Sequence, residues 1–245
     1  AGAAVMRALA GFDRFQILRR AADAITARAN ELGKLISLEE GKTLREGVFE
    51  ATRAAETMHL SAEEAKRLGG EVLPMDGAPG GGERLGFTLR VPCGVVVAIT
   101  PFNFPLNLLA HKVAPAIAVG SALVVKPPPQ CPQMAFRLGA IMAECGLPAG
   151  AYNVLHLPIP VAERLATDPR FQMLTFTGSP AVGWHLKKVA GKKKVCLELG
   201  GNAAAVVHED AGDLDWVAQR LALGAFAYAG PVCIKGQRIL VHQPI

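Results

Sequence analysis

Aromatic side chains are scarce in this sequence, which has 10 Phe, 2 Tyr and 2 Trp among 245 residues. Small residues dominate instead, which favours helices packed closely on a sheet. No apolar run is long and unbroken enough to span a bilayer, and no signal peptide opens the chain, so we expect no membrane partner. The composition, 51% hydrophobic and 19% charged, excludes a disordered chain.

The sequence also lacks any CxxC spacing, although it has five cysteines. An odd number without paired spacing argues against a disulfide framework and against a zinc site, so we expect no metal. A reducing, cytoplasmic location fits this cysteine usage. Cysteine identity alone leaves open whether Cys233, in the stretch AYAGPVCIKGQR, is a buried spacer or a nucleophile.

A concentrated basic surface is missing as well, despite a net charge of +5. The one dense run, Lys192 to Lys194, precedes an apolar strand-like segment and has no aromatic residues interleaved. This pattern predicts a solvated start of a strand rather than a surface for nucleic acid, which we do not expect as a partner.

The N-terminal part is predicted to be helical as far as about residue 70, because Phe15, Leu18, Ala22 and Ile25 recur at helical spacing. We assign these helices to core packing and give them no chemistry. The Gly- and Pro-rich stretch 69–83 predicts a loop. The alternation over Phe87–Val91 predicts an exposed strand.

Strand and helix patterns alternate regularly from Val95 onward, which predicts an α/β fold with an open, mostly parallel sheet and helices on both faces. Predicted strands cover residues 95–99, 122–125, 152–157, 171–176 and 194–199. Predicted helices cover residues 106–119, 134–145, 162–167 and 180–190.

Polar residues follow several of these strands, at the edge where such sheets bind ligands. Asn103, in PFNFP, is either a turn residue or an amide donor to a developing oxyanion. Lys126 either extends to solvent or holds a ribose hydroxyl or phosphate. Glu198, in ELGGN, is either an ion-pair partner or a general base.

The stretch TGSPAVG begins a helix directly after a strand. Pro180 suits the first helical turn, and Gly178 allows a ligand to approach the backbone N–H groups. The motif GxGxxG is absent, so an ordinary helix start and a pyrophosphate site both remain open at Gly178 and Ser179.

The ordered set PFNFP, VVKP, FTGSPAVG, LELGGN and GPVC resembles the NAD(P)-dependent aldehyde dehydrogenase superfamily, from its nucleotide-binding half through the catalytic cysteine. The likeness covers the whole chain, including ELGKLISLEEGKTLREG. It implies a Rossmann-like fold of the aldehyde dehydrogenase type, truncated before most of the catalytic domain. Residues 1–200 would form the nucleotide-binding domain, with 84–97 as part of an oligomerisation arm, and 201–245 would begin the catalytic domain.

The resemblance also implies roles for particular residues. Cys233 matches the catalytic thiol, Glu198 the general base, Asn103 the oxyanion donor that acts with the Cys233 N–H, and Lys112 a lysine near the catalytic centre. The residues implied to bind the cofactor, with Lys126 at the adenosine ribose and Gly178 and Ser179 at the pyrophosphate, are Thr100, Pro101, Phe102, Lys126, Phe176, Gly178, Ser179, Leu199 and Gly200.

The implied function is oxidation of a small aldehyde to a carboxylic acid, with hydride transfer to NAD or NADP through a cysteine thiohemiacetal and thioester. The full-length form is expected to be a homo-oligomer. Two alternatives stay open: a non-catalytic nucleotide-binding or structural protein on this scaffold, and an enzyme that passes the acyl group to coenzyme A or phosphate, against which Glu198 argues.

Two departures from the family pattern bear on these roles. Pro231 stands where glutamine is common, which removes the N–H of residue 231 and leaves that of Cys233. Pro129 stands where many members carry glutamate beside the ribose. Without that carboxylate a 2′-phosphate meets less repulsion, so we expect NADP to be accepted at least as well as NAD.

Overall fold

The structure, a computed structural model, describes residues 2–243 and is built around a five-stranded sheet in the order β5-β4-β3-β6-β7. Every neighbouring pair in it is parallel, which confirms the predicted open parallel sheet. The strands are β3 (Val96–Ile99), β4 (Leu123–Lys126), β5 (Tyr152–Val154), β6 (Met173–Thr177) and β7 (Lys194–Glu198).

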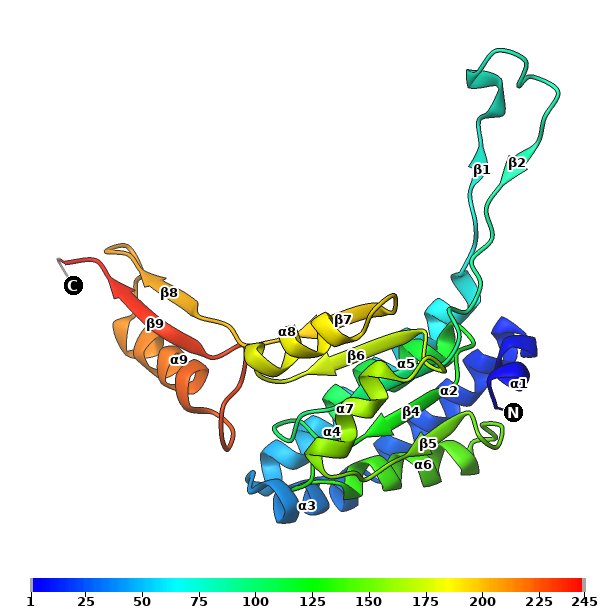
Figure 1. Ribbon diagram of the computed structural model, residues 1–245. Coiled ribbons are helices and arrows are strands. Elements are labelled where there is room, and N and C mark those ends of the chain that lie inside the picture. Colours follow the sequence, from blue (N-terminus) through cyan, green and yellow to red (C-terminus); the bar gives the residue numbers. More distant parts are fainter. Residues whose placement is uncertain (1, 244–245) are drawn as a thin grey trace.

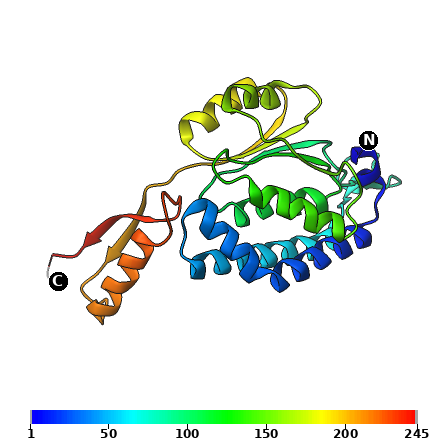
Figure 2. The same ribbon diagram turned by 90° about the horizontal axis from the view of Figure 1, so that it is seen from below.

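Helices cover both faces of the sheet, as Figure 2 shows. The strand β3 explains why, since Val96 and Ala98 enter one apolar core and Val97 and Ile99 enter the other. The second core is closed by α7 (Ile159–Thr167) and α8 (Pro180–Val189). The helices of the first core are α1 (Gly2–Ala8), α2 (Gly11–Ala27), α3 (Ala29–Glu40), α4 (Leu44–Arg67), α5 (Asn107–Ala118) and α6 (Gln133–Glu144).

The helices α3 and α4 approach each other unusually closely at two glycines. A Cβ atom at Gly33 would lie 2.5 Å from the backbone nitrogen of Val48, and one at Gly47 would lie 2.3 Å from the carbonyl oxygen of Gly33. Between the helices, Gly41 has φ = 92°, and Thr43 caps α4 by accepting a hydrogen bond from the backbone N–H of Glu46. The predicted N-terminal helices are therefore confirmed, and their crossing depends on small residues.

A slender hairpin projects from the body of the molecule (Figure 1). It consists of β1 (Val72–Leu73) and β2 (Gly86–Phe87), paired antiparallel, with a 3-10 turn at Met75–Gly77 between them. The prediction of a strand over residues 87–91 was wrong beyond Phe87: the N–H of Thr88 still donates across the hairpin to the carbonyl oxygen of Glu71 at 2.9 Å, but residues 88–91 form no strand. The stretch 69–83, predicted to be a loop, forms the first strand and the turn of the hairpin. The segment 84–97, predicted to be part of an oligomerisation arm, includes at its end the first two residues of β3.

The C-terminal part forms a second, smaller unit beyond the end of β7 (Figure 1). It contains β8 (Ala203–Val207), α9 (Leu214–Phe226) and β9 (Gly236–Val241), and β8 pairs parallel with β9. Its strands and helix present most of their side chains to solvent. Over residues 2–243, no helix is long and apolar enough to cross a membrane.

Candidate active site

Two cavities meet at the carboxyl ends of β3, β6 and β7. The smaller, of about 340 Å³, brings Asn103 and Cys233 together. The larger, of about 540 Å³, extends from it toward Lys126. Five residues line both cavities: Pro101, Phe102, Thr177, Gly178 and Ser179.

Cys233 is exposed and lies in the loop between α9 and β9. This loop is held against the main body at Tyr228, whose N–H donates to Glu46 Oε1 at 2.9 Å and whose ring packs edge-on against Phe104 at a centroid distance of 4.9 Å. Tyr228 has φ = 68°, a left-handed conformation that is costly for a residue with a side chain. The surrounding contacts therefore impose the shape of the cysteine loop.

Asn103 contacts the same loop from the main body. Its Nδ2 donates to the carbonyl oxygen of Pro231 at 2.7 Å, two residues before Cys233 in the chain. Its Oδ1 is buried and accepts no hydrogen bond from residues 2–243. A side-chain amide has two N–H groups, so one remains for a ligand after the bond to Pro231. The carbonyl oxygen of residue 231 thus anchors the amide to the loop that carries Cys233.

A buried ion pair supports Asn103 from behind. Lys42 Nζ donates to Glu50 Oε2 at 2.6 Å and to the carbonyl oxygen of Asn103 at 2.5 Å, and both charged side chains are completely buried. The same ammonium group lies 3.7 Å from the centroid of the Phe104 ring. Lys42 therefore fixes the backbone on which the amide is carried.

The other oxygen of Glu50 caps the next helix. Glu50 Oε1 accepts from the backbone N–H groups of Leu106 and Asn107, at 2.8 and 3.0 Å, at the start of α5. A carboxylate at this position also matches the positive end of the helix dipole. One buried carboxylate thus connects α4, Lys42 and the helix that follows the Asn103 loop.

Lys112 and Glu198 lie outside the lining of both cavities. Lys112, on α5, is 6% exposed and donates from Nζ to Thr175 Oγ1 at 3.0 Å. Burial lowers the pKa of Lys112 to about 8, while the nearby Cys196 and Glu198 act in the opposite direction. Glu198 is exposed at the end of β7 and lies near Lys112, so the structure leaves the predicted base outside the cavity that holds the thiol.

The nine residues predicted to bind a cofactor all line one of the two cavities. At the junction, α8 begins after Ser179 with no side chain capping its N–H groups. Gly178 has no room for a larger residue, since a Cβ atom there would lie 2.5 Å from the Phe176 ring. Lys126 is 5% exposed, and burial lowers its pKa; Nζ has no hydrogen-bond or ion-pair partner among residues 2–243. The two cavities therefore offer free N–H groups at a helix start, a glycine that lets a ligand approach the backbone closely, and a cation. This combination fits a dinucleotide.

Three residues that shape the site were missed by the sequence reasoning, which gave no chemistry to the N-terminal helices and no role to Tyr228. They are Lys42, Glu50 and Tyr228. The available signal was Glu50, a charged residue placed among the buried positions Gly47, Ala51 and Ala54 of α4. A charge on the apolar stripe of a helix indicates a buried partner.

The comparisons with known proteins identify the family of the chain. A model of the aldehyde dehydrogenase family matches residues 1–245, and the chain belongs to this family. It is 46% identical over 235 residues to a 3-sulfolactaldehyde dehydrogenase of Priestia aryabhattai, covering 96% of this chain and 49% of that protein. It is 41% identical over 236 residues to the mitochondrial succinate-semialdehyde dehydrogenase of Arabidopsis thaliana, covering 95% and 44%.

Solved structures show the same likeness. Aldehyde dehydrogenase 21 of Physcomitrella patens, in complex with the reaction product succinate, matches with a TM-score of 0.94 and 40% identity over 99% of this chain and 51% of that one. A glyceraldehyde-3-phosphate dehydrogenase of Methanocaldococcus jannaschii complexed with NADP matches with a TM-score of 0.91 and 38% identity, covering 99% and 53%. The chain thus spans about half the length of the relatives it matches.

Proposed function

We propose that this chain forms the nucleotide-binding and thiol-bearing part of an enzyme that oxidises an aldehyde to a carboxylic acid with NAD or NADP. The observation that carries the proposal is the cavity in which Asn103 and Cys233 meet, continuous with a groove suited to a dinucleotide. Relatives named for sulfolactaldehyde, succinate semialdehyde and lactaldehyde support an aldehyde as substrate.

The first step is attack by the Cys233 thiolate on the carbonyl carbon of the aldehyde, which forms a C–S bond and leaves an oxyanion. The Cys233 backbone N–H and the second N–H of Asn103 Nδ2 would donate to this oxyanion. The bond from Asn103 to Pro231 holds the amide close to the thiol, and Lys42 holds the Asn103 backbone. The loop and the helices therefore position both partners before substrate arrives.

A bound nicotinamide would supply the acceptor for the hydride that leaves the same carbon, and Cys233 would then hold the acyl group as a thioester. Glu198 would take a proton from water as the water oxygen attacks the thioester carbon. The C–S bond breaks, the acid leaves and the thiol is restored. Because Glu198 is exposed and lies outside the cavity lining, we propose that its side chain turns toward the thioester or acts through an intervening water.

The larger cavity would hold the nucleotide. Lys126 would contact the adenosine ribose, and the N–H groups at Gly178 and Ser179 would contact the pyrophosphate. Pro129 lines this cavity and brings no carboxylate to it, and the one carboxylate in the described lining, Glu163, lies 3.2 Å from His185 Nε2, so Lys126 can pair with a 2′-phosphate. We therefore propose that NADP binds at least as well as NAD; relatives of both kinds are known, one solved with NADP and another named NAD-dependent.

Thiol labelling tests the proposal on the 245-residue chain, because Cys196 is a second exposed thiol and serves as a matched control. With iodoacetamide at neutral pH, Cys233 should label faster than Cys196, with Cys233→Ser and Cys196→Ser variants assigning each rate by mass spectrometry. Adding NADP or NAD should change the Cys233 rate alone, and the half-saturating concentration of NADP should not exceed that of NAD.

Equal, slow labelling of both thiols that neither nucleotide changes would favour the non-catalytic alternative. A response to NAD at concentrations far below those needed for NADP would contradict the role given to Pro129. The expected cytoplasmic location and the expected absence of nucleic-acid binding stay predictions.

A further inference from the structure

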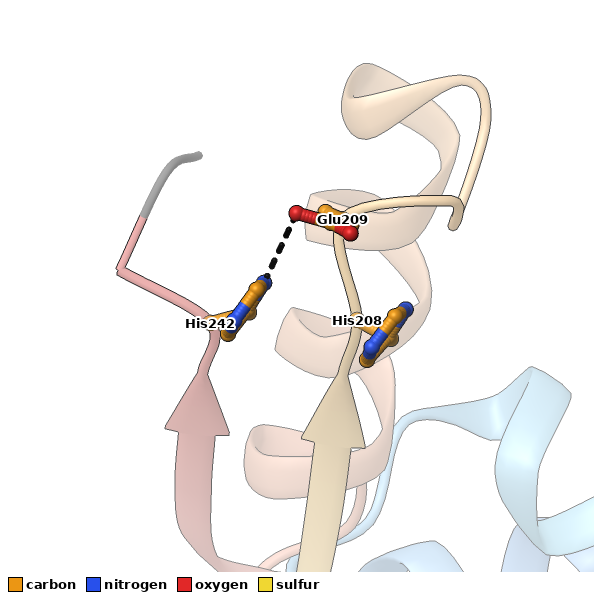
Figure 3. Close-up of side chains that lie close together, drawn as sticks. All are labelled: His208, Glu209 and His242. Atoms are coloured by element: carbon orange, nitrogen blue, oxygen red, sulfur yellow. Dashed lines mark ion pairs between the residues drawn. The ribbon is translucent and has the colours of Figure 1, made fainter.

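Two histidines lie side by side at one end of the C-terminal sheet (Figure 3). His208 directly follows β8 and His242 directly follows β9, and the last paired residues of these strands are Val207 and Val241. The N–H of His242 donates to the carbonyl oxygen of Val207 at 2.9 Å, which continues the ladder by one bond. The parallel register therefore brings the two rings together, stacked at 5.0 Å between centroids with 3° between their planes.

Glu209 completes a group of three potential ligands. Its Oε2 lies 3.3 Å from His242 Nδ1, and one ligand atom from each of the three residues lies within 4.8 Å of the others. Two atoms bound to one tetrahedral zinc ion at 2.0–2.1 Å are separated by roughly 3.4 Å. The pair from Glu209 and His242 is already at this spacing, whereas the His208 ring must turn out of the stack to direct a nitrogen at the same ion.

A second carboxylate orients His208. Asp210 Oδ1 lies 2.9 Å from His208 Nδ1, so the ring N–H at this position is held by Asp210 and Nε2 is left as the atom that can bind a metal. Histidine ligands of metals commonly have such a carboxylate on the opposite ring nitrogen. The contact thus gives His208 the kind of outer carboxylate partner that a metal-bound histidine uses.

We propose that His208, Glu209 and His242 bind a divalent cation of the zinc class, with water in the remaining position. Two imidazoles and one carboxylate suit Zn²⁺ better than Ca²⁺ or Mg²⁺, which prefer sets of oxygen ligands. The side chains of the three residues are 60%, 53% and 43% exposed in chain order, so they are accessible to an ion and free to adjust. The ion would join the ends of β8 and β9 and does not depend on the proposed dehydrogenase activity.

The experiment is a calorimetric titration of the 245-residue chain with ZnCl₂ after its thiols have been blocked with iodoacetamide, since Cys196 and Cys233 are exposed and also bind zinc. One ion per chain should bind. His208→Gln, Glu209→Gln and His242→Gln should each weaken binding about tenfold or more. These substitutions are at exposed positions, and circular dichroism checks that each variant is folded.

The matched control is His59→Gln. His59 is also exposed and lies 3.7 Å from a single carboxylate, Asp23, but has no second histidine beside it. Its variant should bind zinc as the unsubstituted chain does. The proposal is overturned if the unsubstituted chain binds no stoichiometric zinc, if the three variants retain full affinity, or if His59→Gln weakens binding as much as they do.

Discussion

Glu50 is the single residue on which most of the site's internal order depends. One of its carboxylate oxygens accepts a hydrogen bond from Lys42, and the other accepts from two backbone N–H groups at the start of α5. Both side chains of the ion pair are fully buried. Removing one partner of a buried ion pair leaves the other charge without compensation. Replacing the Glu50 carboxylate with an amide of the same size should therefore lower the free energy of unfolding strongly.

Glu50→Gln is therefore expected to lower the free energy of unfolding by about 3–5 kcal/mol, measured by urea denaturation. Glu56→Gln is the matched control on the same helix, because the Arg53–Glu56 pair is about half exposed. Its effect should stay within about 0.5 kcal/mol. Lys42→Met combined with Glu50→Gln should cost less than the sum of the two single substitutions. Equal effects of Glu50→Gln and Glu56→Gln would contradict this account.

At the scale of single residues, sequence reasoning found the side chains that follow strands and missed those that support them. Asn103 and Lys126 could be singled out because the ends of parallel strands are where ligands bind. Lys42 and Glu50 could not be placed, because their partner, the Asn103 loop, is distant in the chain and becomes adjacent only when α4 packs on α5. The assigned roles of Cys233 and Glu198 stay predictions.

Among the elements, the crossing of α3 and α4 has the least tolerance for change. Gly33 and Gly47 face each other there, and a methyl group on either would meet backbone atoms that cannot move aside. Small residues at both positions set the distance between these helices.

Gly33→Ala and Gly47→Ala are each expected to lower the free energy of unfolding by about 1–3 kcal/mol through overpacking. Gly224→Ala on α9 is the control, because no atom lies within 4 Å of the position of its Cβ. It should leave stability unchanged or raise it by about 0.5–1 kcal/mol, since alanine favours helix. Thermal and urea unfolding measure all three, and destabilisation by Gly224→Ala equal to the others would contradict the crossing as the cause.

Periodicity predicted most elements correctly where burial was strong. β3 lies between two helical layers, so its continuous apolar run was informative. The alternation at residues 87–91 was misleading because Leu89 and Val91 are 73% and 68% exposed and have no sheet to face. An apolar pattern indicates that a segment needs a partner, and it does not say whether the partner lies in the same chain.

For the molecule as a whole, the projecting hairpin is the surface most in need of an explanation. Leu85, Phe87 and Leu89 are 79%, 59% and 73% exposed on a thin two-stranded element that has free edges. Exposed apolar edges favour pairing with another chain. The oligomerisation arm predicted over residues 84–97 stays a prediction.

We expect the chain to associate with itself through this hairpin. Replacing Leu85, Phe87 and Leu89 with serine should shift sedimentation velocity profiles toward the monomer at the same protein concentration. Leu38→Ser is the control, because Leu38 is 73% exposed on α3, away from the hairpin. Unchanged association in the hairpin variant, or a monomeric unsubstituted chain at every concentration, would exclude this role.

The junction at residues 199–202 has a further consequence. It links the main body to the unit of β8, α9 and β9, and the thiol of Cys233 comes from that unit while the amide of Asn103 comes from the main body. The spacing between the two groups is thus set by docking contacts at Glu46, Phe104 and Tyr228. A small displacement at these contacts would move the thiol away from the amide while the helices and strands on both sides stay folded. The proposed reaction can therefore be lost without unfolding of the protein.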